Sequence, residues 1–187
     1  QLLALRSPGG NGSHVERYTT QAVLDIETRL LQRAGRLAGQ QSDRVVPQAV
    51  AQSAQSSRTF NDDQARAFAQ LVGTDRIATV HGAAGTGKSY VLAGMREAYE
   101  AAGFTVHGAI LQGKTAEDLE RDSGIRSQTI HGFLNAVDKG YTSLSDRSVI
   151  VVDEAGMVGS RQMEQLLEHV EASGARLRLV GDTRQLH

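Results

Sequence analysis

A glycine-rich segment between an expected strand and an expected helix constrains the fold of this chain more than any other feature. Residues 82–89 read Gly-Ala-Ala-Gly-Thr-Gly-Lys-Ser and satisfy the pattern G-x-x-x-x-G-K-[ST] in full. Glycines let backbone N–H groups approach phosphate oxygens, and the helix expected from Lys88 directs its positive dipole end at the same anion. The segment therefore predicts a phosphate-binding loop, the alternative being a glycine-rich turn with a surface lysine. The predicted nucleotide-binding residues of the loop are Gly82, Gly85, Thr86, Gly87, Lys88 and Ser89.

The rest of the chain alternates between helical and strand patterns, as parallel α/β folds do. Helices are expected at 61–72, 88–101, 116–122, 129–138 and 160–172, and strands at 76–81, 104–110, 148–153 and 176–181. This alternation predicts an α/β domain with a central parallel sheet over residues 59–187.

Residues 1–58 are expected to form an N-terminal extension of that domain. A Gly/Ser/Asn-rich patch makes residues 1–18 look like a loop, and the glutamine- and serine-rich stretch 39–58 is typical of a linker or mobile loop. Between them, Val23, Leu30 and Leu37 recur every seven residues, which predicts an amphipathic helix over 20–38. That helix packs on the next domain, or it contacts DNA or a partner.

Composition excludes several classes of function. The 187 residues contain 20 Lys and Arg against 21 Asp and Glu, a net charge of −1, so any contact with nucleic acid must be local. The absence of cysteine excludes disulfides and thiolate metal sites, and no apolar run approaches the ~18 residues that span a bilayer. We expect a cytoplasmic protein without membrane contact. The chain starts at Gln1 without Met and stops at His187 after a strand-like run, so we expect a piece of a longer protein.

Two acidic residues follow the most apolar expected strand. Val149–Val152 is an uninterrupted β-branched run that leads into Asp153 and Glu154, 65 residues after Lys88. The carboxyl end of such a strand faces the crevice where ligands bind in open α/β sheets. Asp153, together with the Ser89 hydroxyl, is predicted to hold Mg²⁺, and Glu154 to polarise an attacking water as general base. ATP and Mg²⁺ are the expected cofactors.

These segments resemble the motifs of a superfamily 1 helicase of the RecD-like branch. Residues 82–89, 153–156 and 181–186 are similar to motifs I, II and III. The resemblance implies a RecA-like fold in which the first strand lies beside the fourth, followed by the third and second. It also implies that Gln185 senses the γ-phosphate and that Lys88 and Glu154 act with it in hydrolysis.

Three weaker segments agree with that resemblance. Residues 60–64 are similar to the adenine-reading Q motif, which implies that Gln64 pairs with the adenine edge. Residues 111–116 and 128–131 are similar to motifs Ia and Ib, which contact the backbone of single-stranded DNA. The implied DNA-binding residues are Gln112, Lys114, Thr129 and His131. Lys114 is otherwise a solvated loop lysine, and His131 a residue that caps or packs a short helix.

A closer resemblance is to the helicase portion of conjugative relaxase-helicases of the TraA/TraI kind. It is carried by residues 153–162 and by the helix opening 17–20 followed by Glu27, and it covers residues 17–186. It implies a motor that moves 5′ to 3′ on single-stranded DNA and unwinds plasmid DNA for transfer. Its partners would be single-stranded DNA and, in the parent chain, a relaxase domain and a second RecA-like domain.

The sequence stops after motif III, so motifs IV to VI and their arginine finger are not in it. An arginine finger contributes ~10³–10⁵ to related phosphoryl transfers. We therefore expect these 187 residues to bind nucleotide, to hydrolyse it feebly and not to unwind DNA. Two other functions stay open: a RecD-like motor of a recombination exonuclease, and a degenerate, non-catalytic module that only grips single-stranded DNA.

Overall fold

A parallel sheet forms the centre of the protein, and the computed structural model describes residues 2–6, 16–83 and 85–181. Within those residues, five parallel strands pair in the order β3 (Ile77–His81), β7 (Arg176–Gly181), β6 (Ser148–Val152), β4 (Thr105–Ile110) and β5 (Ser127–Thr129). The predicted α/β fold and the predicted order of its first four strands are confirmed. Because every ladder of this sheet is parallel, the carboxyl ends of the strands lie along one edge.

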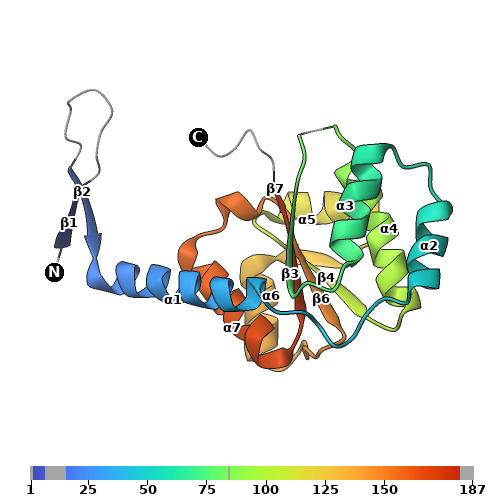
Figure 1. The fold of residues 1–187 in the computed structure, drawn as a ribbon. Coiled ribbons are helices and arrows are strands. Elements are labelled where there is room, and N and C mark those ends of the chain that lie inside the picture. The colour runs from blue at the N-terminus through green and yellow to red at the C-terminus, as the bar shows by residue number, and fades with distance from the viewer. Residues whose placement is uncertain (1, 7–15, 84, 182–187) are drawn as a thin grey trace.

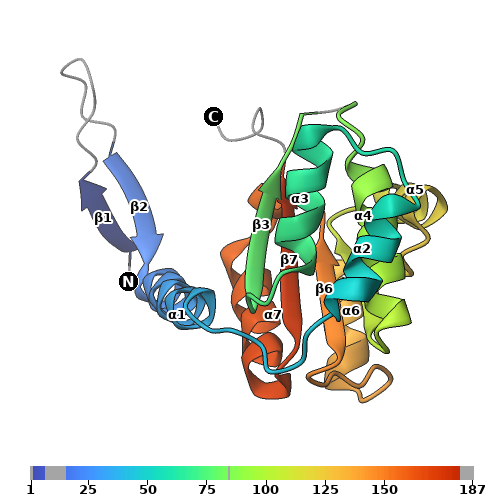
Figure 2. The same cartoon turned by 45° about the vertical axis from the view of Figure 1, so that its right-hand side comes forward.

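Helices cover both faces of the sheet (Figures 1 and 2). One face carries α2 (Gln48–Ser56), α3 (Asp62–Val72), α4 (Lys88–Ala101) and α5 (Gly113–Ser123), and the other carries α1 (Gln21–Ala38), α6 (Ile130–Asp138) and α7 (Ser160–Ser173). Strand β6 shows why the apolar run was needed: Val149 and Val151 enter the first core, and Ile150 and Val152 the second. A strand buried on both faces has no polar side.

Helix α1 is the amphipathic helix expected from the sequence. The Thr20 hydroxyl caps its first turn by accepting a hydrogen bond from Val23 N at 3.4 Å. Leu30 and Ala34 pack against the second core and Leu37 is fully buried there, so the interpretation that this helix packs on the next domain is confirmed. Its N-terminal half extends past the edge of the α/β layers (Figures 1 and 2).

Two expectations about the N-terminal extension were wrong. Residues 39–58 are not a linker throughout, because α2 forms within them and Val46 and Ala54 pack against the first core. The alanines and glutamines of this stretch are good helix formers, which outweighs its low complexity. Residues 1–18 are not simply a loop either: β1 (Leu2–Arg6) pairs antiparallel with β2 (Glu16–Thr20). The glycine-rich patch between these strands lies outside the described residues.

Strand β5 was not predicted. Its sequence, Ser-Gln-Thr, has no apolar pattern, and it forms because the backbone pairs with β4, with Gly108 opposite Ser127. A Cβ at Gly108 would clash with the Ser127 side chain, so glycine is needed for this close approach. Among the described residues, no helix combines the length and apolar character that crossing a bilayer requires.

Candidate nucleotide-binding site

The glycine-rich loop joins the end of β3 to the start of α4, as the motif requires. Gly85 and Gly87 adopt left-handed backbone with φ of 79° and 82°, which L side chains rarely tolerate. The Lys88 ammonium folds back and donates to the Gly82 carbonyl at 2.7 Å. The Thr86 hydroxyl donates to the Ala83 carbonyl at 2.8 Å, which closes the turn from inside. These two hydrogen bonds link the described residues on either side of Ala84, with Lys88 held against Gly82.

Gln64 joins the loop to the first turn of α3. Asn61 and Gln64 form a reciprocal capping box, in which the Asn61 side chain accepts from Gln64 N at 2.9 Å and Gln64 Oε1 accepts from Asn61 N. Gln64 Nε2 also donates to the Thr86 carbonyl at 3.0 Å. A primary amide has two donors and two lone pairs, so one donor and one lone pair of Gln64 are left. Those are the groups that bidentate pairing with an adenine edge requires.

Gly87 is required by this contact as well as by its backbone angle. A Cβ at Gly87 would lie 2.6 Å from Gln64 Nε2, so any side chain there would push the amide away from the loop. Gln64 and the loop are therefore fitted to each other.

The acidic pair lies one strand away from the loop strand, because β7 separates β3 from β6. Asp153 and Glu154 are half-buried at the carboxyl end of β6. Burial raises the pKa of the Asp153 carboxyl, while a hydrogen bond from Glu154 N at 2.9 Å and the charge of Lys88 act to lower that pKa. Because β3, β7 and β6 are parallel neighbours, the loop and the acidic pair both lie at the carboxyl edge of the sheet.

Glu154 adopts a backbone conformation that the sequence did not reveal. Its φ of 55° and ψ of 37° are left-handed, and it is the one non-glycine residue with positive φ among those the structure describes. It precedes the short 3₁₀ turn η1 (Ala155–Met157). Strained backbone of this kind concentrates at functional sites, where it orients a side chain.

The residues present fit a magnesium ion. Mg²⁺ is commonly bound by one or two protein groups while phosphate and water oxygens complete its octahedron. Ser89, in the first turn of α4, supplies a hydroxyl, and Asp153 supplies a carboxylate whose charged form burial disfavours until a cation is near. Over residues 2–6, 16–83 and 85–181, no group of three or more His, Asp or Glu forms a cage for a metal on its own.

A cleft of about 590 Å³ opens beside the loop. Its lining includes Gln64, Lys88 and the glycines of the loop, together with Arg66 and Gln70 from the same face of α3. Pockets of about 300–1,000 Å³ are typical of small-molecule sites. The cleft therefore has the size and the donors for a nucleotide.

The predicted DNA-contacting residues lie at the same edge of the sheet, beyond β6. Ile110 at the end of β4 pairs with Thr129 at the end of β5, which brings the two segments together. Lys114 and His131 are exposed in the first turns of α5 and α6, and Gln112 is exposed at the N-cap of α5. The Thr129 hydroxyl caps α6 by accepting from Gly132 N at 3.1 Å. These four residues are grouped, but they are separate from the nucleotide residues.

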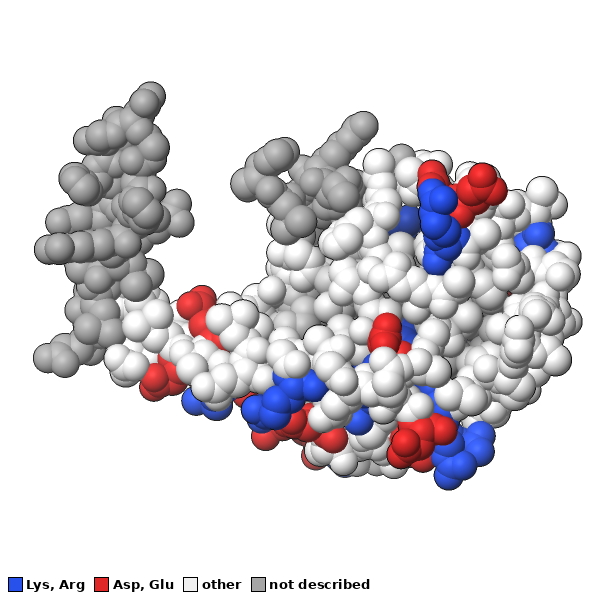
Figure 3. Space-filling model, in the orientation of Figure 1, with Lys and Arg blue, Asp and Glu red and all other residues white. Residues whose placement is uncertain are grey.

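The face drawn in Figure 3 carries acidic and basic groups side by side rather than one extended basic field, in keeping with the net charge of −1. Electrostatic attraction of a DNA strand would thus have to be local to the sheet edge.

Gln185 lies outside the described residues. Sequence reasoning missed two arginines of β7, Arg176 and Arg178, which are fully buried. The available signal was the alternation Arg-Leu-Arg-Leu in a strand expected at the centre of the sheet, where both arginines must point into the same core.

The parallel sheet, the glycine-rich loop between its first strand and α4, and the acidic pair after β6 define a P-loop nucleotide-binding domain. Residues 59–187 match the AAA domain family, and the chain belongs to that family.

Three relatives show which proteins carry a similar segment. The chain is 39% identical over 170 residues to a "Probable conjugal transfer protein TraA" of Sinorhizobium fredii, which covers 91% of this chain and 15% of that protein. It is 36% identical over 170 residues to the conjugal transfer protein TraA of Rhizobium radiobacter, covering 91% of this chain and 16% of the relative. It is 33% identical over 131 residues to the ATP-dependent RecD2 DNA helicase of Deinococcus radiodurans, covering 68% and 18%.

The chain thus spans less than a fifth of the length of these relatives. It is a helicase-like AAA domain of the TraA and RecD-like type, as the sequence resemblance indicated.

Proposed function

We propose that this chain is the first motor domain of an ATP-dependent DNA helicase that works in conjugative transfer. The observation that carries the proposal is that the Lys88 loop and the pair Asp153 and Glu154 follow parallel strands at the same edge of the sheet. The names of the similar proteins, two of which are conjugal transfer proteins and one an ATP-dependent DNA helicase, support the same function.

Each group at the site has a role in binding or hydrolysing ATP. The loop amides and Lys88 hold the phosphates, and Ser89 and Asp153 hold Mg²⁺, which when bound would neutralise charge on the outer phosphates. Glu154 accepts a proton from the attacking water, and its strained backbone fixes where its carboxylate lies. Gln64 selects the base with the donor and lone pair that its contacts to Asn61 and Thr86 leave. We assign Gln185 to sensing the γ-phosphate by resemblance alone.

DNA binding is assigned to the other half of the same edge. Gln112, Lys114, Thr129 and His131 would contact the backbone of a single strand, and movement would run 5′ to 3′ as in the helicases that the chain resembles. A second RecA-like domain would close over the nucleotide, and a relaxase domain would share the parent chain. We place this work in the cytoplasm.

Within the chain, we propose that residues 59–187 form the motor domain and residues 1–58 an extension of it. Helices α1 and α2 of that extension pack on the two cores of the α/β layers, so they would move with the motor domain as one unit.

The decisive experiment measures ATP hydrolysis by the full-length parent protein with and without single-stranded DNA. Glu154→Gln should keep nucleotide binding and abolish turnover, whereas Lys88→Ala should abolish binding itself. Glu117→Gln, an exposed carboxylate on α5, is the matched control and should behave as wild type. A low rate that neither DNA nor Glu154→Gln changes would refute the motor.

The chain of 187 residues by itself should bind nucleotide and turn it over slowly, because the second motor domain supplies the arginine finger. Rapid steady-state hydrolysis by this chain would contradict that division of labour.

The similarity to RecD2 favours one second candidate, a RecD-like motor of a recombination exonuclease. The domain that precedes Gln1 in the parent protein discriminates the two, since a relaxase there supports conjugation. The third hypothesis is a degenerate module that only grips single-stranded DNA. A nucleotide titration distinguishes it from both motors.

A further inference from the structure

A buried polar cluster joins the far ends of the two helices whose near ends form the nucleotide site. The cluster consists of Tyr99 on α4 and of Arg176 and Arg178 on β7, all with no exposed surface. None of the three belongs to the nucleotide-binding residues described above. Charged side chains are almost never fully buried without a partner that accounts for them.

The partners of these arginines are backbone carbonyls at the end of α3. Arg178 Nε donates to the Leu71 carbonyl at 2.6 Å and its Nη2 donates to the Gly73 carbonyl at 3.3 Å. Arg176 Nη1 donates to the same Gly73 carbonyl at 3.1 Å. The last carbonyls of a helix have no partner within it, so the two arginines act as its C-terminal cap.

Tyr99 connects this cap to α4. Its hydroxyl donates to the Leu71 carbonyl at 2.9 Å and accepts from Arg176 at 3.0 Å and from Arg178 at 2.8 Å. One hydroxyl thereby joins α3, α4 and β7. Over the part of the chain that the structure describes, neither guanidinium forms an ion pair with a carboxylate.

The near ends of the same helices meet at the phosphate loop. Helix α3 begins with the Asn61 and Gln64 capping box, and α4 begins at Lys88. Gln64 Nε2 on the Thr86 carbonyl joins the two near ends, as Tyr99 on the Leu71 carbonyl joins the far ones. The helices lie side by side on one face of the sheet (Figures 1 and 2).

Helix α3 is short and stiff enough to transmit a constraint from one end to the other. Its 11 residues span roughly 16 Å at about 1.5 Å per residue. A shift of its C-terminal end by the loss of the cap therefore tilts its first turn, where Gln64 lies. A tilt of α3 should affect Lys88 less than Gln64, because the hydrogen bond from Lys88 to the Gly82 carbonyl is internal to the loop.

We propose that Tyr99, Arg176 and Arg178 are positioning residues that hold α3 against α4 and so fix Gln64 for recognition of the nucleotide base. This inference rests on the proposed nucleotide-binding function of the site. Phosphate affinity and base selectivity then depend on different parts of the protein. The loop determines how tightly phosphates bind, and the buried cluster determines how well adenine is distinguished from another base.

The test compares the affinities of the full chain for ATP and GTP, measured by competition against a fluorescent nucleotide. Gln64→Ala is the reference for lost base recognition, and Tyr99→Phe removes the single hydroxyl that joins α3, α4 and β7 while keeping the ring. Phe133→Leu, a fully buried change in the core on the other face of the sheet, is the matched control for general loosening.

Wild type should prefer ATP, and Tyr99→Phe should reduce that preference by about three- to tenfold, the worth of one hydrogen bond. Its affinity for GTP should change little, and Phe133→Leu should keep the wild-type ratio. Arg178→Met should lower the ratio in the same direction; if it fails to fold, Tyr99→Phe alone decides.

The proposal is overturned if Tyr99→Phe keeps the wild-type ratio while Gln64→Ala loses it, or if Phe133→Leu lowers the ratio equally. A wild type that binds both nucleotides alike also overturns it, without touching the proposed function. If the wild type binds neither nucleotide, as is expected of Lys88→Ala, the proposed function itself is refuted.

Discussion

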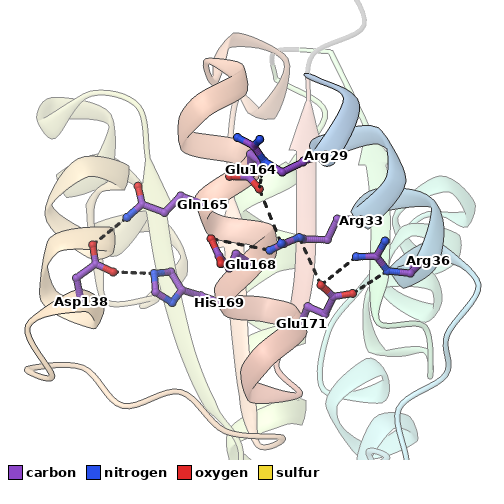
Figure 4. Close-up of polar contacts among 9 residues, drawn as sticks. All are labelled: Arg29, Arg33, Arg36, Asp138, Glu164, Gln165, Glu168, His169 and Glu171. Atoms are coloured by element: carbon purple, nitrogen blue, oxygen red, sulfur yellow. Dashed lines mark hydrogen bonds and ion pairs between the residues drawn. The ribbon is translucent and has the colours of Figure 1, made fainter. Parts of the chain in front are cut away.

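Two groups of arginines lie on opposite faces of the sheet and are stabilised in opposite ways. On α1, Arg29, Arg33 and Arg36 face the carboxylates of Glu164, Glu168 and Glu171 on α7, as Figure 4 shows. On β7, Arg176 and Arg178 face backbone carbonyls and a tyrosine hydroxyl. The first group pairs charge with charge, with Arg29 and Arg36 open to water and Arg33 and Glu164 largely buried between the helices, and the second bonds charge to neutral oxygens in the core.

Exposure decides what each arrangement contributes. Arg36 donates to Glu171 at 3.0 Å while 53% of its side chain stays exposed, so solvent and salt screen that pair. Arg178 is fully buried, and burial lowers the pKa of its guanidinium, which nevertheless remains charged. Exposed ion pairs such as that of Arg36 with Glu171 should therefore contribute little to stability, whereas the buried arginine Arg178, which has no carboxylate partner, should contribute much.

The largest effect is expected from Arg178→Met. This change removes several charge-assisted hydrogen bonds from a dry core and leaves the carbonyls of Leu71 and Gly73 with one donor each instead of two, so the free energy of unfolding should fall by about 3–5 kcal/mol. Urea denaturation followed by circular dichroism measures it. Arg126→Met, at an exposed arginine, is the control and should stay within about 0.5 kcal/mol of wild type. If Arg178→Met and Arg126→Met were equally stable, the buried arginine would contribute no more to stability than an exposed one, which would contradict this prediction.

The second prediction tests whether apolar burial holds α1 against α7. Leu37 is fully buried in the second core, so Leu37→Ala should lower the free energy of unfolding by about 3 kcal/mol through lost burial and a cavity. Leu31→Ala, on the same helix but 69% exposed, is the matched control and should cost little. If Leu31→Ala proves as costly as Leu37→Ala, α1 is not docked as described.

Sequence reasoning succeeds where a local pattern is enough to determine the structure. The motif around Lys88 and the apolar run before Asp153 predicted the loop and the acidic pair from local pattern, and the resemblance to RecD-like helicases implied the order of four strands. The docking face of α1 followed from the spacing of Leu30 and Leu37.

What the sequence did not predict depends on contacts between distant segments. Strand β5 exists because Gly108 lets Ser127 approach, and the second helix of the extension exists because Ala54 finds a core to pack on. The role of Arg178 depends on Leu71, 107 residues earlier in the chain. The strain at Glu154 has no local signal at all, since glutamate has no preference for left-handed backbone.

A third, smaller effect separates the two buried arginines. Arg176 leaves its Nε and Nη2 without hydrogen-bond partners, whereas Arg178 uses all three of its nitrogens. Arg176→Met removes unsatisfied buried donors along with two good bonds, so it should cost only about 1–2 kcal/mol. Chemical denaturation of the two methionine variants side by side measures the difference. A loss for Arg176→Met that matches Arg178→Met would mean that the cluster acts as an undivided unit.

The smallest effect is expected from Glu171→Gln at the α1–α7 interface. The hydrogen bond from Arg36 lowers the pKa of the Glu171 carboxyl below its ordinary value of 4.5, so the charged form stabilises the folded state. This contribution is present above pH 4.5 and is lost as the pH falls through that value towards the lower pKa of the folded state. At pH 7 the change should cost less than about 1 kcal/mol.

Salt and acid distinguish this interface from the buried cluster. The cost of Glu171→Gln should shrink in 1 M salt, where the Debye length is about 3 Å. It should vanish once the pH has fallen through the lowered pKa of the folded state, because Glu171 is then protonated in wild type as well. The cost of Arg178→Met should persist in high salt, because solvent ions do not reach a fully buried guanidinium. Denaturation curves of both variants at low and high salt measure this. If high salt abolished both costs alike, burial would not be what separates the two groups of arginines.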